Sequence, residues 1–389
     1  MARIAVVGAG PAGVIASYFA SQNEMNEVVI FEAVSPLKTI LPTGGGRCNL
    51  AFGEFDFREL AKFYPRGEKF LFSVFSKFST AETLEFFEKI GVETYMQEDM
   101  RIFPVSNSAK EVREKLLNSL KGCKIQKEKV TQIIKKENGF EVQSVKSKYL
   151  FDRVILALGG HAGFELARKL GHKIITPKPS LTGFITEKDY AVLSGVSVEA
   201  DVIASFDGKT VFEERGNVLF THKGVSGPMV YKISSICARE NFSKENPIFI
   251  KLKFLSDDVD FQKLLEENAK KDLKNLISEF MPKSFAEYVL NQAKIKLDKK
   301  CFEINKELRE RVLTQLKEFE IKAVSPFKDG EVVTSGGVCL DEINSKNMQS
   351  KLVDGVYFCG EVIDVDGFCG GFNLQNCWST GYIAGIANS

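Results

Sequence analysis

A glycine-rich hexapeptide near the start of the chain carries the clearest chemical signal. Gly8, Gly10 and Gly13 fit the pattern G-x-G-x-x-G, with Pro11 and Ala12 between the last two glycines. The first glycine permits a tight turn, the second lets a pyrophosphate approach the backbone, and the third allows a helix to pack closely on a strand. Free N–H groups at the start of the following helix would then bind phosphate. The motif therefore predicts a dinucleotide site.

A carboxylate at the end of the next expected strand supports this prediction. Glu32 follows Gly13 by about 20 residues, which is the spacing of the residue that accepts hydrogen bonds from ribose hydroxyls. Its negative charge would repel a 2′-phosphate. We expect the adjoining Ala33 to lie at the same end of the cofactor.

Three features favour FAD over NAD as the dinucleotide. The motif starts within ten residues of the N-terminus, and Pro11 and Ala12 follow its second glycine. Further glycine-rich segments lie at 158–160, after an expected strand, and at 360–371, near the C-terminus. Because a flavin dinucleotide is long, several loops must converge along it, whereas a simple NAD dehydrogenase would not need the C-terminus to return to the first domain.

The elements that must position these residues alternate between strand and helix. Residues 3–8 and 27–32 are short, apolar and β-branched, and they flank an expected helix over 11–22. This βαβ pattern predicts a parallel sheet. Further expected elements are helices over 57–77, 79–90 and 108–121, three strands within 123–158, and a closing helix after a C-terminal glycine turn. The fold class is therefore α/β, with a Rossmann-like FAD-binding domain built from both chain ends.

The middle of the chain has a different texture. Over 172–256, short alternating runs are separated by turn residues roughly every 8–12 positions, which predicts a small antiparallel barrel. Residues 257–322 balance Lys with Glu, break at Pro282, and predict a helical insert with a solvated face. The FAD domain would then comprise 1–171 and 323–389.

Composition excludes several classes of protein. The 389 residues carry 52 Lys and Arg against 51 Asp and Glu, so the basic excess typical of nucleic-acid binders is absent. Eight cysteines without C-x-x-C spacing and three histidines predict no zinc site and no oxidising compartment. The uncharged stretch from Ile4 to Ala20 is interrupted by glycines and Pro11, which argues against a membrane span. We expect a soluble, cytoplasmic protein that acts on a small-molecule substrate. We expect no nucleic-acid partner, no membrane partner and no metal. The sequence does not indicate the oligomeric state.

Seven segments, taken in order, resemble those of a known group of flavoproteins. They are VVGAGPAG (6–13), TGGGRCNL (43–50), RIFPVS (101–106), VILALGG (154–160), LFTHKGVSGP (219–228), VVTSGGVCLDEI (332–343) and the run at 354–375. With them, the chain resembles bacterial FAD-dependent oxidoreductases of the aminoacetone-oxidase and bile-acid enone-reductase type, within the superfamily that has a glutathione-reductase-like FAD domain. The resemblance implies an FAD domain, a barrel-like insert and a helical insert.

The chain departs from the group's pattern at three places. Leu158 stands where the group usually has Thr, and the loop after Gly160 is shorter than in other members; these two departures affect one wall of the cofactor or substrate pocket. Cys369 also stands where Thr is common. We therefore transfer no substrate specificity from the resemblance.

The motifs and the resemblance together predict the remaining cofactor contacts. Three glycines before Arg47 permit close approach of the backbone to flavin or pyrophosphate, and Arg47 can neutralise phosphate or bond a flavin or substrate oxygen. The final helix would present its N-terminus to the N1/O2 side of the flavin, and Val130 would meet adenine through its backbone. These contacts are Gly45, Gly46, Arg47, Cys48, Asn49, Val130, Ala157, Leu158, Gly159, Gly160, Gly360, Glu361, Asp364, Gly371, Phe372, Asn373, Leu374 and Gln375.

The catalytic groups are less evident, because the sequence contains no defined acid/base pair. His222 in the barrel insert and Arg101, beside Phe103, are the candidates. A redox role for Cys48 would need a second thiol, which only the fold could bring near, for example Cys369.

The electron source also stays open. NAD(P)H could dock transiently without a domain of its own, or the substrate could reduce the flavin, with O₂ or an unsaturated carbonyl compound as acceptor. A non-catalytic or regulatory FAD-binding protein and an RNA-modifying flavoprotein are the alternatives.

Overall fold

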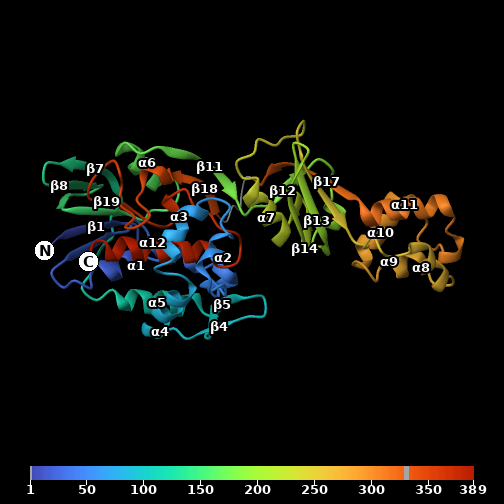
Figure 1. The fold of residues 1–389 in the computed structure, drawn as a ribbon, viewed down its shortest axis with the longest axis horizontal. Helices are drawn as coiled ribbons and strands as arrows, with labels where there is room; N and C mark the ends of the chain where they lie inside the picture. Colours follow the sequence, from blue (N-terminus) through green and yellow to red (C-terminus); the bar gives the residue numbers. More distant parts are fainter. Residues whose placement is uncertain (1, 328–332) are drawn as a thin grey trace. The chain divides into compact units, whose positions relative to one another are not determined.

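The computed structural model describes residues 2–327 and 333–389, and the chain divides into two compact units (Figure 1). Unit 1 comprises Met1–Lys178 and Val333–Ser389, and unit 2 comprises Pro179–Val332. The chain thus leaves unit 1 after residue 178 and returns to it at residue 333. The sequence pattern predicts these two limits at residues 172 and 323 instead. The reason is that β11 (Ile174–Ser180) pairs with β18 (Val333–Val338) in a two-stranded sheet, which keeps most of both strands with unit 1.

Unit 1 is built on a five-stranded parallel sheet with the order β19-β10-β1-β2-β6. The central strand β1 (Arg3–Val7) lies between β10 (Arg153–Leu156) and β2 (Glu27–Phe31). The edges are β19 (Val356–Phe358) and β6 (Lys124–Gln126). β-Branched residues fill β1 and β2, whose last four residues are buried. This confirms the predicted α/β, Rossmann-like fold from both chain ends.

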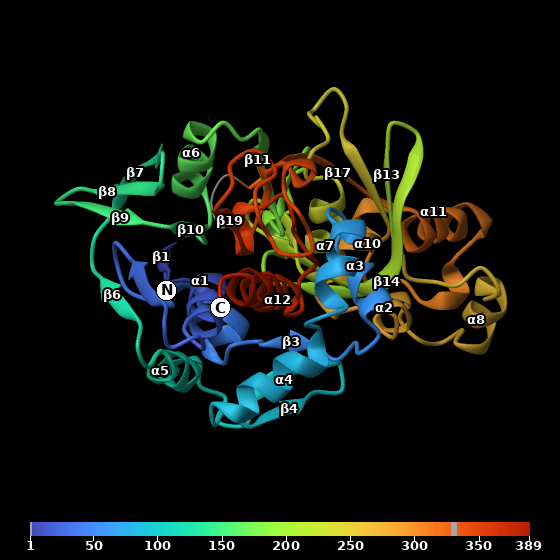
Figure 2. The ribbon, with the colours of Figure 1, turned by 60° about the vertical axis from the view of Figure 1, so that its left-hand side comes forward.

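Two helices from opposite ends of the chain pack together beside this sheet (Figure 2). They are α1 (Pro11–Ala20) and α12 (Phe372–Ile386). Glycines of α12 make the close approach possible: a Cβ at Gly381 would lie 2.6 Å from the carbonyl oxygen of Ala12, and one at Gly385 would lie 2.8 Å from that of Ala16. The C-terminal helix is therefore an integral part of the core of unit 1.

Smaller elements complete unit 1. Two antiparallel sheets have the orders β3-β5-β4 and β7-β8-β9. Their strands are β3 (Ala51–Phe52), β4 (Thr94–Met96), β5 (Arg101–Pro104), β7 (Val130–Lys136), β8 (Gly139–Ser144) and β9 (Lys148–Phe151). The helices are α2 (Phe57–Ala61), α3 (Glu68–Phe75), α4 (Thr80–Lys89), α5 (Ala109–Ser119) and α6 (His161–Lys169).

Two of the expected elements were wrong. The helix expected over 57–77 is two helices, α2 and α3, because Pro65 and Gly67 interrupt it and Gly67 begins α3 with a left-handed φ of +93°. The segment 123–158 holds five strands rather than three, since two hairpin turns divide the expected runs.

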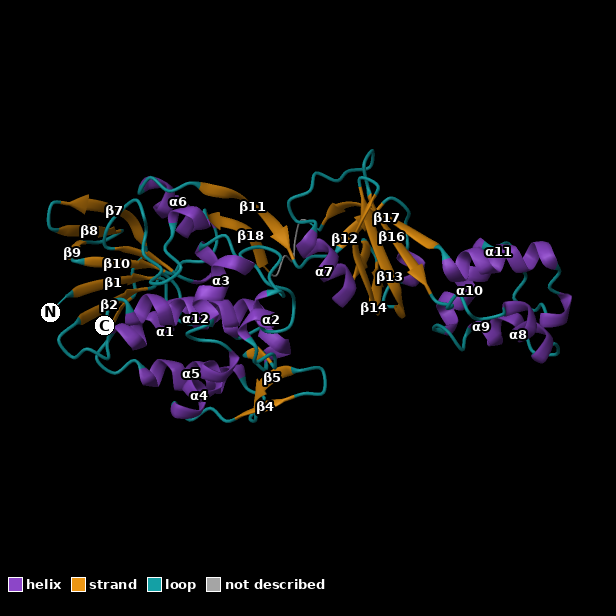
Figure 3. Ribbon diagram, in the orientation of Figure 1, coloured by secondary structure: helices purple, strands orange, loops and turns teal. Residues whose placement is uncertain are grey.

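Within its described residues 179–327, unit 2 is a closed six-stranded antiparallel barrel with the order β12-β15-β14-β13-β16-β17, together with five α-helices (Figure 3). The strands are β12 (Phe184–Thr186), β13 (Ser197–Phe206), β14 (Lys209–Thr221), β15 (Gly224–Ser226), β16 (Ile248–Lys253) and β17 (Phe319–Pro326). The helices are α7 (Pro228–Ile236), α8 (Phe261–Glu267), α9 (Leu273–Ile277), α10 (Lys283–Gln292) and α11 (Lys306–Lys317). The barrel-like and helical parts that we predicted are both present. They share one hydrophobic core, so they form a single unit.

A buried histidine joins three segments of unit 1. His172 Nδ1 lies 3.0 Å from Glu342 Oε2, and its Nε2 lies 2.9 Å from the hydroxyl of Ser350. That hydroxyl already accepts hydrogen bonds from the backbone N–H of Leu352 and Val353, so its own proton points to Nε2. The geometry therefore fits a neutral imidazole that donates from Nδ1. Burial lowers the pKa of His172 despite the nearby carboxylate.

This network predicts a pH dependence of stability. The unfolded chain binds a proton at His172 near the ordinary pKa of 6.5, whereas the folded chain resists it. The free energy of unfolding should thus fall as the pH drops through 6.5 and level off below the lower pKa of the folded state. Urea unfolding of wild type and His172→Gln at about pH 7.5 and about pH 5.5 tests this. The His172→Gln variant should lack this pH-dependent loss of unfolding free energy. The control His161→Gln, at an exposed position, should keep it. Equal pH dependence in wild type and His172→Gln would refute the assignment.

Candidate flavin site

Four glycine-rich or acidic segments meet at the carboxyl edge of the parallel sheet. The loop from Gly8 follows β1, Glu32 follows β2, Ala157 to Gly160 follow β10, and Gly360 follows β19. In open α/β sheets, ligands bind outside the carboxyl ends of the strands. The structure therefore brings together most of the residues that we predicted for the dinucleotide.

The three fingerprint glycines have distinct structural reasons. Gly8 has a φ of +107°, and a Cβ there would lie 2.8 Å from the carbonyl oxygen of Ala157. A Cβ at Gly13 would lie 1.9 Å from the carbonyl oxygen of Gly8. Gly10 differs, because a Cβ there would have no protein atom within 4 Å. Gly10 is also the N-cap of α1 and makes no side-chain cap, so that helix N-terminus is open to an anion.

Glu32 is held in place by backbone groups. Its Oε2 accepts a hydrogen bond from Ala9 N at 3.0 Å, and its Oε1 accepts one from Val34 N at 2.8 Å. Each oxygen keeps further lone-pair capacity, which suits two ribose hydroxyls. Ala33 is exposed beside it, and Val130 follows closely after Gln126, whose carbonyl accepts from Glu32 N.

The segment after β19 reaches the same place. Gly360 has a φ of +75°, and a Cβ there would lie 2.6 Å from Cβ of Ala12 in α1. The carboxylate of Glu361 lies against Gly159, where a Cβ would stand 2.9 Å from its Oε2. Asp364 is nearly buried, and its N–H donates to the carbonyl oxygen of Val338. Glu361 thus stands beside the turn after β10, whereas Asp364 is held against the carboxyl end of β18.

A second cluster forms around the loop 43–50. Gly44, Gly45 and Gly46 all have left-handed φ angles, and a Cβ at Gly44 would lie 2.7 Å from Phe103 in β5. The following residues pair with β5, because Leu50 N donates to the carbonyl oxygen of Ile102. The turn before α12 lies alongside, since a Cβ at Gly371 would be 2.7 Å from the backbone of Ala51.

The N-terminus of α12 offers backbone groups rather than side chains. Phe372 stacks on Phe63 with ring centroids 4.6 Å apart. Asn373 exchanges hydrogen bonds with the backbone of Gly367, and the amide nitrogen of Gln375 donates to Thr83 and Ser379. Because Gly371 caps the helix with no side-chain bond, the first N–H groups, including that of Leu374, are left for a ligand. We had predicted all four residues as contacts without distinguishing backbone from side chain.

Helix α12 links the two clusters. Phe372 belongs to the loop cluster, and Gly381 packs on Ala12 at the start of α1. Nine helical residues span about 14 Å. A ligand that touches both clusters must therefore be long, as a flavin dinucleotide is.

The residues present fit FAD. The side chain of Asn49 is 8% exposed, and its Oδ1 has no hydrogen-bond partner within the described residues, although a buried amide oxygen normally has one. In the other cluster, a Cβ at Gly10 would meet no atom within 4 Å, so the backbone there is open to a ligand. When bound, FAD would supply hydride-transfer chemistry, with Glu32 and the α1 N-terminus at its adenosine and pyrophosphate end, and the loop 43–50 with the α12 N-terminus at its flavin end.

The two catalytic candidates lie in different surroundings. Arg101 lies in unit 1, where its guanidinium is paired with Asp99 and lies 5.6 Å from the centre of the Phe103 ring. His222 lies in unit 2, exposed in the turn between β14 and β15. A role for His222 remains a prediction.

Cysteine chemistry gains no support from the geometry. The eight cysteines are free, and Cys48 is fully buried with a left-handed φ of +66°. Burial raises the pKa of Cys48 to about 12, so it is a thiol rather than a nucleophilic thiolate at neutral pH. The described residues contain no cluster of three His, Cys, Asp or Glu placed to hold a metal. Within 2–327 and 333–389, none of the helices combines the length and apolar character that a membrane crossing requires.

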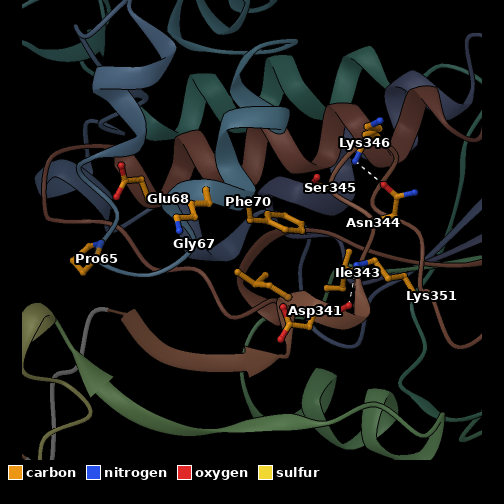
Figure 4. Close-up of a pocket in the computed structure, with 12 residues that line it drawn as sticks. Pro65, Gly67, Glu68, Phe70, Asp341, Ile343, Asn344, Ser345, Lys346 and Lys351 are labelled. Carbon is orange, nitrogen blue, oxygen red and sulfur yellow. Dashed lines mark hydrogen bonds between the residues drawn. The ribbon is translucent and has the colours of Figure 1, made fainter.

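A cavity of about 600 Å³ on unit 1 is not lined by any of the predicted residues (Figure 4). Its walls come from the first turn of α3 and from the segment that includes the short helix Leu340–Glu342. Lys351 Nζ donates across it to the carbonyl oxygen of Asp341, and Lys346 N donates to Asn344. Its acidic and basic side chains largely balance one another, so we assign it no ligand.

An ion pair beside the site escaped sequence reasoning. Arg66 donates from Nε and Nη2 to the two carboxylate oxygens of Asp366, both at 2.5 Å, and Asp366 is completely buried. The pair fixes the segment that leads from Asp364 into the turn at Gly371. A lone Arg between Pro65 and Gly67 gives no sequence signal, because its partner lies 300 residues away.

The fold and these two clusters define the class of the FAD-binding oxidoreductases. A model of the HI0933-like protein Rossmann domain matches residues 2–387, and the chain belongs to this family.

Curated relatives match along almost their full length. A 3-dehydro-bile acid delta(4,6)-reductase of Clostridium scindens is 30% identical over 410 residues, which cover 100% of this chain and 99% of the relative. A ribosomal RNA dihydrouridine synthase of Escherichia coli is 27% identical over 399 residues, which cover 97% and 95%. Among solved structures, a variant of the quinol fumarate reductase subunit FrdA of Escherichia coli superposes with a TM-score of 0.51 at 14% identity, covering 99% of this chain and 69% of that one. The last match shows a shared fold.

Proposed function

We propose that the protein is an FAD-dependent reductase of a carbon–carbon double bond conjugated with a carbonyl group, in a small molecule. The observation that carries the proposal is the convergence of two clusters, one shaped for a dinucleotide phosphate and one lined by a glycine loop and an open helix N-terminus. Both curated relatives are named for the saturation of such a bond: the delta(4,6) bonds conjugated with a 3-oxo group, and the C5=C6 bond of uridine conjugated with its 4-carbonyl.

The chain's own groups divide the work. The N-terminus of α1 and the turn at Gly8 bind the pyrophosphate, and Glu32 binds the ribose. The N-terminus of α12 would place positive partial charge beside the flavin end of bound FAD, where it would stabilise negative charge. Buried aromatic residues around Phe372 exclude water from the base of that cluster.

NAD(P)H is the proposed hydride source for this reductase. The turn at Gly159 and Gly160 imitates half of a second fingerprint, but Gly163 packs against the carbonyl oxygen of Leu158, and Glu361 covers Gly159. These contacts support our assignment of that turn to the FAD domain. The nicotinamide would then dock transiently beside the flavin.

The test combines a redox titration with product analysis. Protein with bound FAD is mixed with NADH or NADPH and with 3-oxo-Δ4 steroids or cyclohexenone, and the saturated ketone is measured. We expect oxidation of nicotinamide only when enone is present, in proportion to saturated product. Nicotinamide oxidation that produces peroxide and no saturated ketone would instead show an oxidase. FAD that neither nucleotide reduces would favour the non-catalytic alternative.

The Escherichia coli relative favours a second candidate, reduction of uridine in ribosomal RNA. The bond chemistry is the same, but the substrate is a polyanion, and the net charge of +1 argues against it. The two candidates separate in one comparison. Ribosomal RNA from an Escherichia coli strain that lacks the gene for its ribosomal RNA dihydrouridine synthase is incubated with this protein and NADPH. The dihydrouridine formed is measured in parallel with the enone assay. Formation of dihydrouridine without enone reduction would reverse our order of preference.

A further inference from the structure

We propose that Arg47 binds the carbonyl oxygen of the substrate and stabilises the enolate that forms there, while Phe103 holds the guanidinium in position. This inference rests on the proposed function and assigns the acceptor subsite within it. The resemblance alone left Arg47 open between phosphate, flavin and substrate.

The position of Arg47 excludes it from the phosphate-binding turn. Its guanidinium carbon lies 3.9 Å from the centre of the Phe103 ring, and Nε donates to the carbonyl oxygen of Gly44. Phe103 is fully buried in β5, so it provides a fixed surface for a cation–π contact. Arg47 therefore belongs to the loop cluster, at the end of the site away from Gly8 and Gly13.

The charge of Arg47 is not balanced by any carboxylate in the described part of the chain. Its Nη1 and Nη2 atoms have no hydrogen-bond partner there, and the side chain is only partly buried. Arg101 approaches the same ring, but Asp99 accepts from its Nε at 2.7 Å and neutralises it. Arg101 in turn lowers the pKa of Asp99, so this pair remains ionised. Of the two arginines beside Phe103, only Arg47 has Nη1 and Nη2 groups that are both available to donate hydrogen bonds to a ligand oxygen.

The flavin has a separate source of positive charge. The N-terminus of the 15-residue helix α12 lies in the same cluster with its first N–H groups uncapped. With FAD bound, those dipoles would stabilise negative charge on its N1/O2 side. The Nη groups of Arg47 are then available to stabilise the negative charge that the reaction creates on the carbonyl oxygen of the substrate.

The reaction balances with Arg47 in this role. With FAD bound, the cofactor would supply a hydride, drawn from NAD(P)H, for addition to the β-carbon of the substrate. The electron pair of the double bond moves to form an enolate whose negative oxygen accepts from the two Nη groups. A proton from solvent then adds to the α-carbon and regenerates the carbonyl. Removing a single donor from a developing oxyanion costs about 100- to 1000-fold in rate, so the loss of both Nη groups should cost at least about 100-fold.

The test compares Arg47→Met, Arg47→Lys and the control Arg58→Met. Arg58 is exposed and lies over Phe57 at 4.7 Å, so the control loses an Arg–Phe contact in the same unit but away from the loop cluster. For each holoenzyme we would measure FAD content, midpoint potential, rate of reduction by NAD(P)H, and rate of reoxidation by cyclohexenone. Arg47→Met should slow only reoxidation, by about 100-fold or more. Arg47→Lys should recover part of that rate, and the control should match wild type.

Two outcomes would overturn the inference. If Arg47→Met loses FAD or shifts the midpoint potential, the residue acts on the cofactor. If it reoxidises as fast as wild type, it has no role at the acceptor. A para-substituted phenol, whose phenolate resembles an enolate, separates failure of the inference from failure of the proposed function. Phenolate binding to oxidised holoenzyme, seen as a long-wavelength absorption band, should require Arg47 even if no enone is reduced.

Discussion

Replacing Gly10 with valine is expected to abolish FAD binding and leave the apo fold unchanged. A side chain at this position meets no protein atom within 4 Å, so it does not disturb the fold. The backbone is already extended, with φ of −75° and ψ of −176°, which a β-branched residue before Pro11 adopts without strain. The valine would instead occupy the space through which the pyrophosphate approaches the α1 N-terminus. We expect FAD affinity to fall at least 100-fold, about 2.8 kcal/mol.

Gly13→Val is the matched comparison within the same motif. Its Cβ would lie 1.9 Å from the carbonyl oxygen of Gly8, so the packing of α1 on the sheet must open. We expect this variant to be destabilised even without cofactor. FAD binding would be measured by absorbance after gel filtration, and the apo fold by the fluorescence of Trp378, the only tryptophan, which is buried in α12. Retention of FAD by Gly10→Val would remove the basis for the phosphate site.

Arg66→Met should cost about 3–5 kcal/mol of folding free energy. The substitution removes the guanidinium that gives Asp366, a completely buried carboxylate, two parallel hydrogen bonds. The buried carboxylate then loses the positive charge that offsets its desolvation, and this accounts for most of the cost. Urea unfolding followed by Trp378 fluorescence reports it, because that residue lies in the same unit.

Two further variants control for this result. Lys62→Met breaks a pair with Glu59 in which both side chains are more than half exposed, and it should cost less than about 1 kcal/mol. The double variant Arg66→Met with Asp366→Leu removes both buried charges and should recover much of the lost stability. A single variant as stable as wild type would show that solvent or other groups satisfy Asp366.

The predictable features were those with short-range causes. The helix after Gly10 begins where expected, and Glu32 stands at the end of its strand, because hydrophobic runs and glycine positions specify local structure. The short alternating runs and the charged segments in the middle of the chain correctly predicted the barrel and the helices of unit 2. The limits of that unit were displaced, because nothing local shows that β11 pairs with β18 across the whole insert.

Most of the features that escaped prediction depend on tertiary structure, and one exception has a local cause. The helix expected over 57–77 ignored Pro65 and Gly67, whose breaking effect is local and could have been applied. The pairing of Arg66 with Asp366 and the stacking of Arg47 on Phe103 join segments far apart in sequence. The sequence predicted that residues at the start of α12 contact the cofactor. Only the structure shows that the side chains of Phe372, Asn373 and Gln375 contact other protein groups instead, which leaves the backbone N–H groups for a ligand.

A single-turnover experiment tests the central claim most directly. Purified protein with bound FAD is reduced anaerobically with one equivalent of NADPH or NADH and mixed with a conjugated enone, while the flavin spectrum is recorded. We predict that the oxidised flavin band returns without oxygen and that one saturated ketone forms per flavin. A flavin that stays reduced with every enone and reoxidises only when air is admitted would contradict the assignment as a conjugated-double-bond reductase.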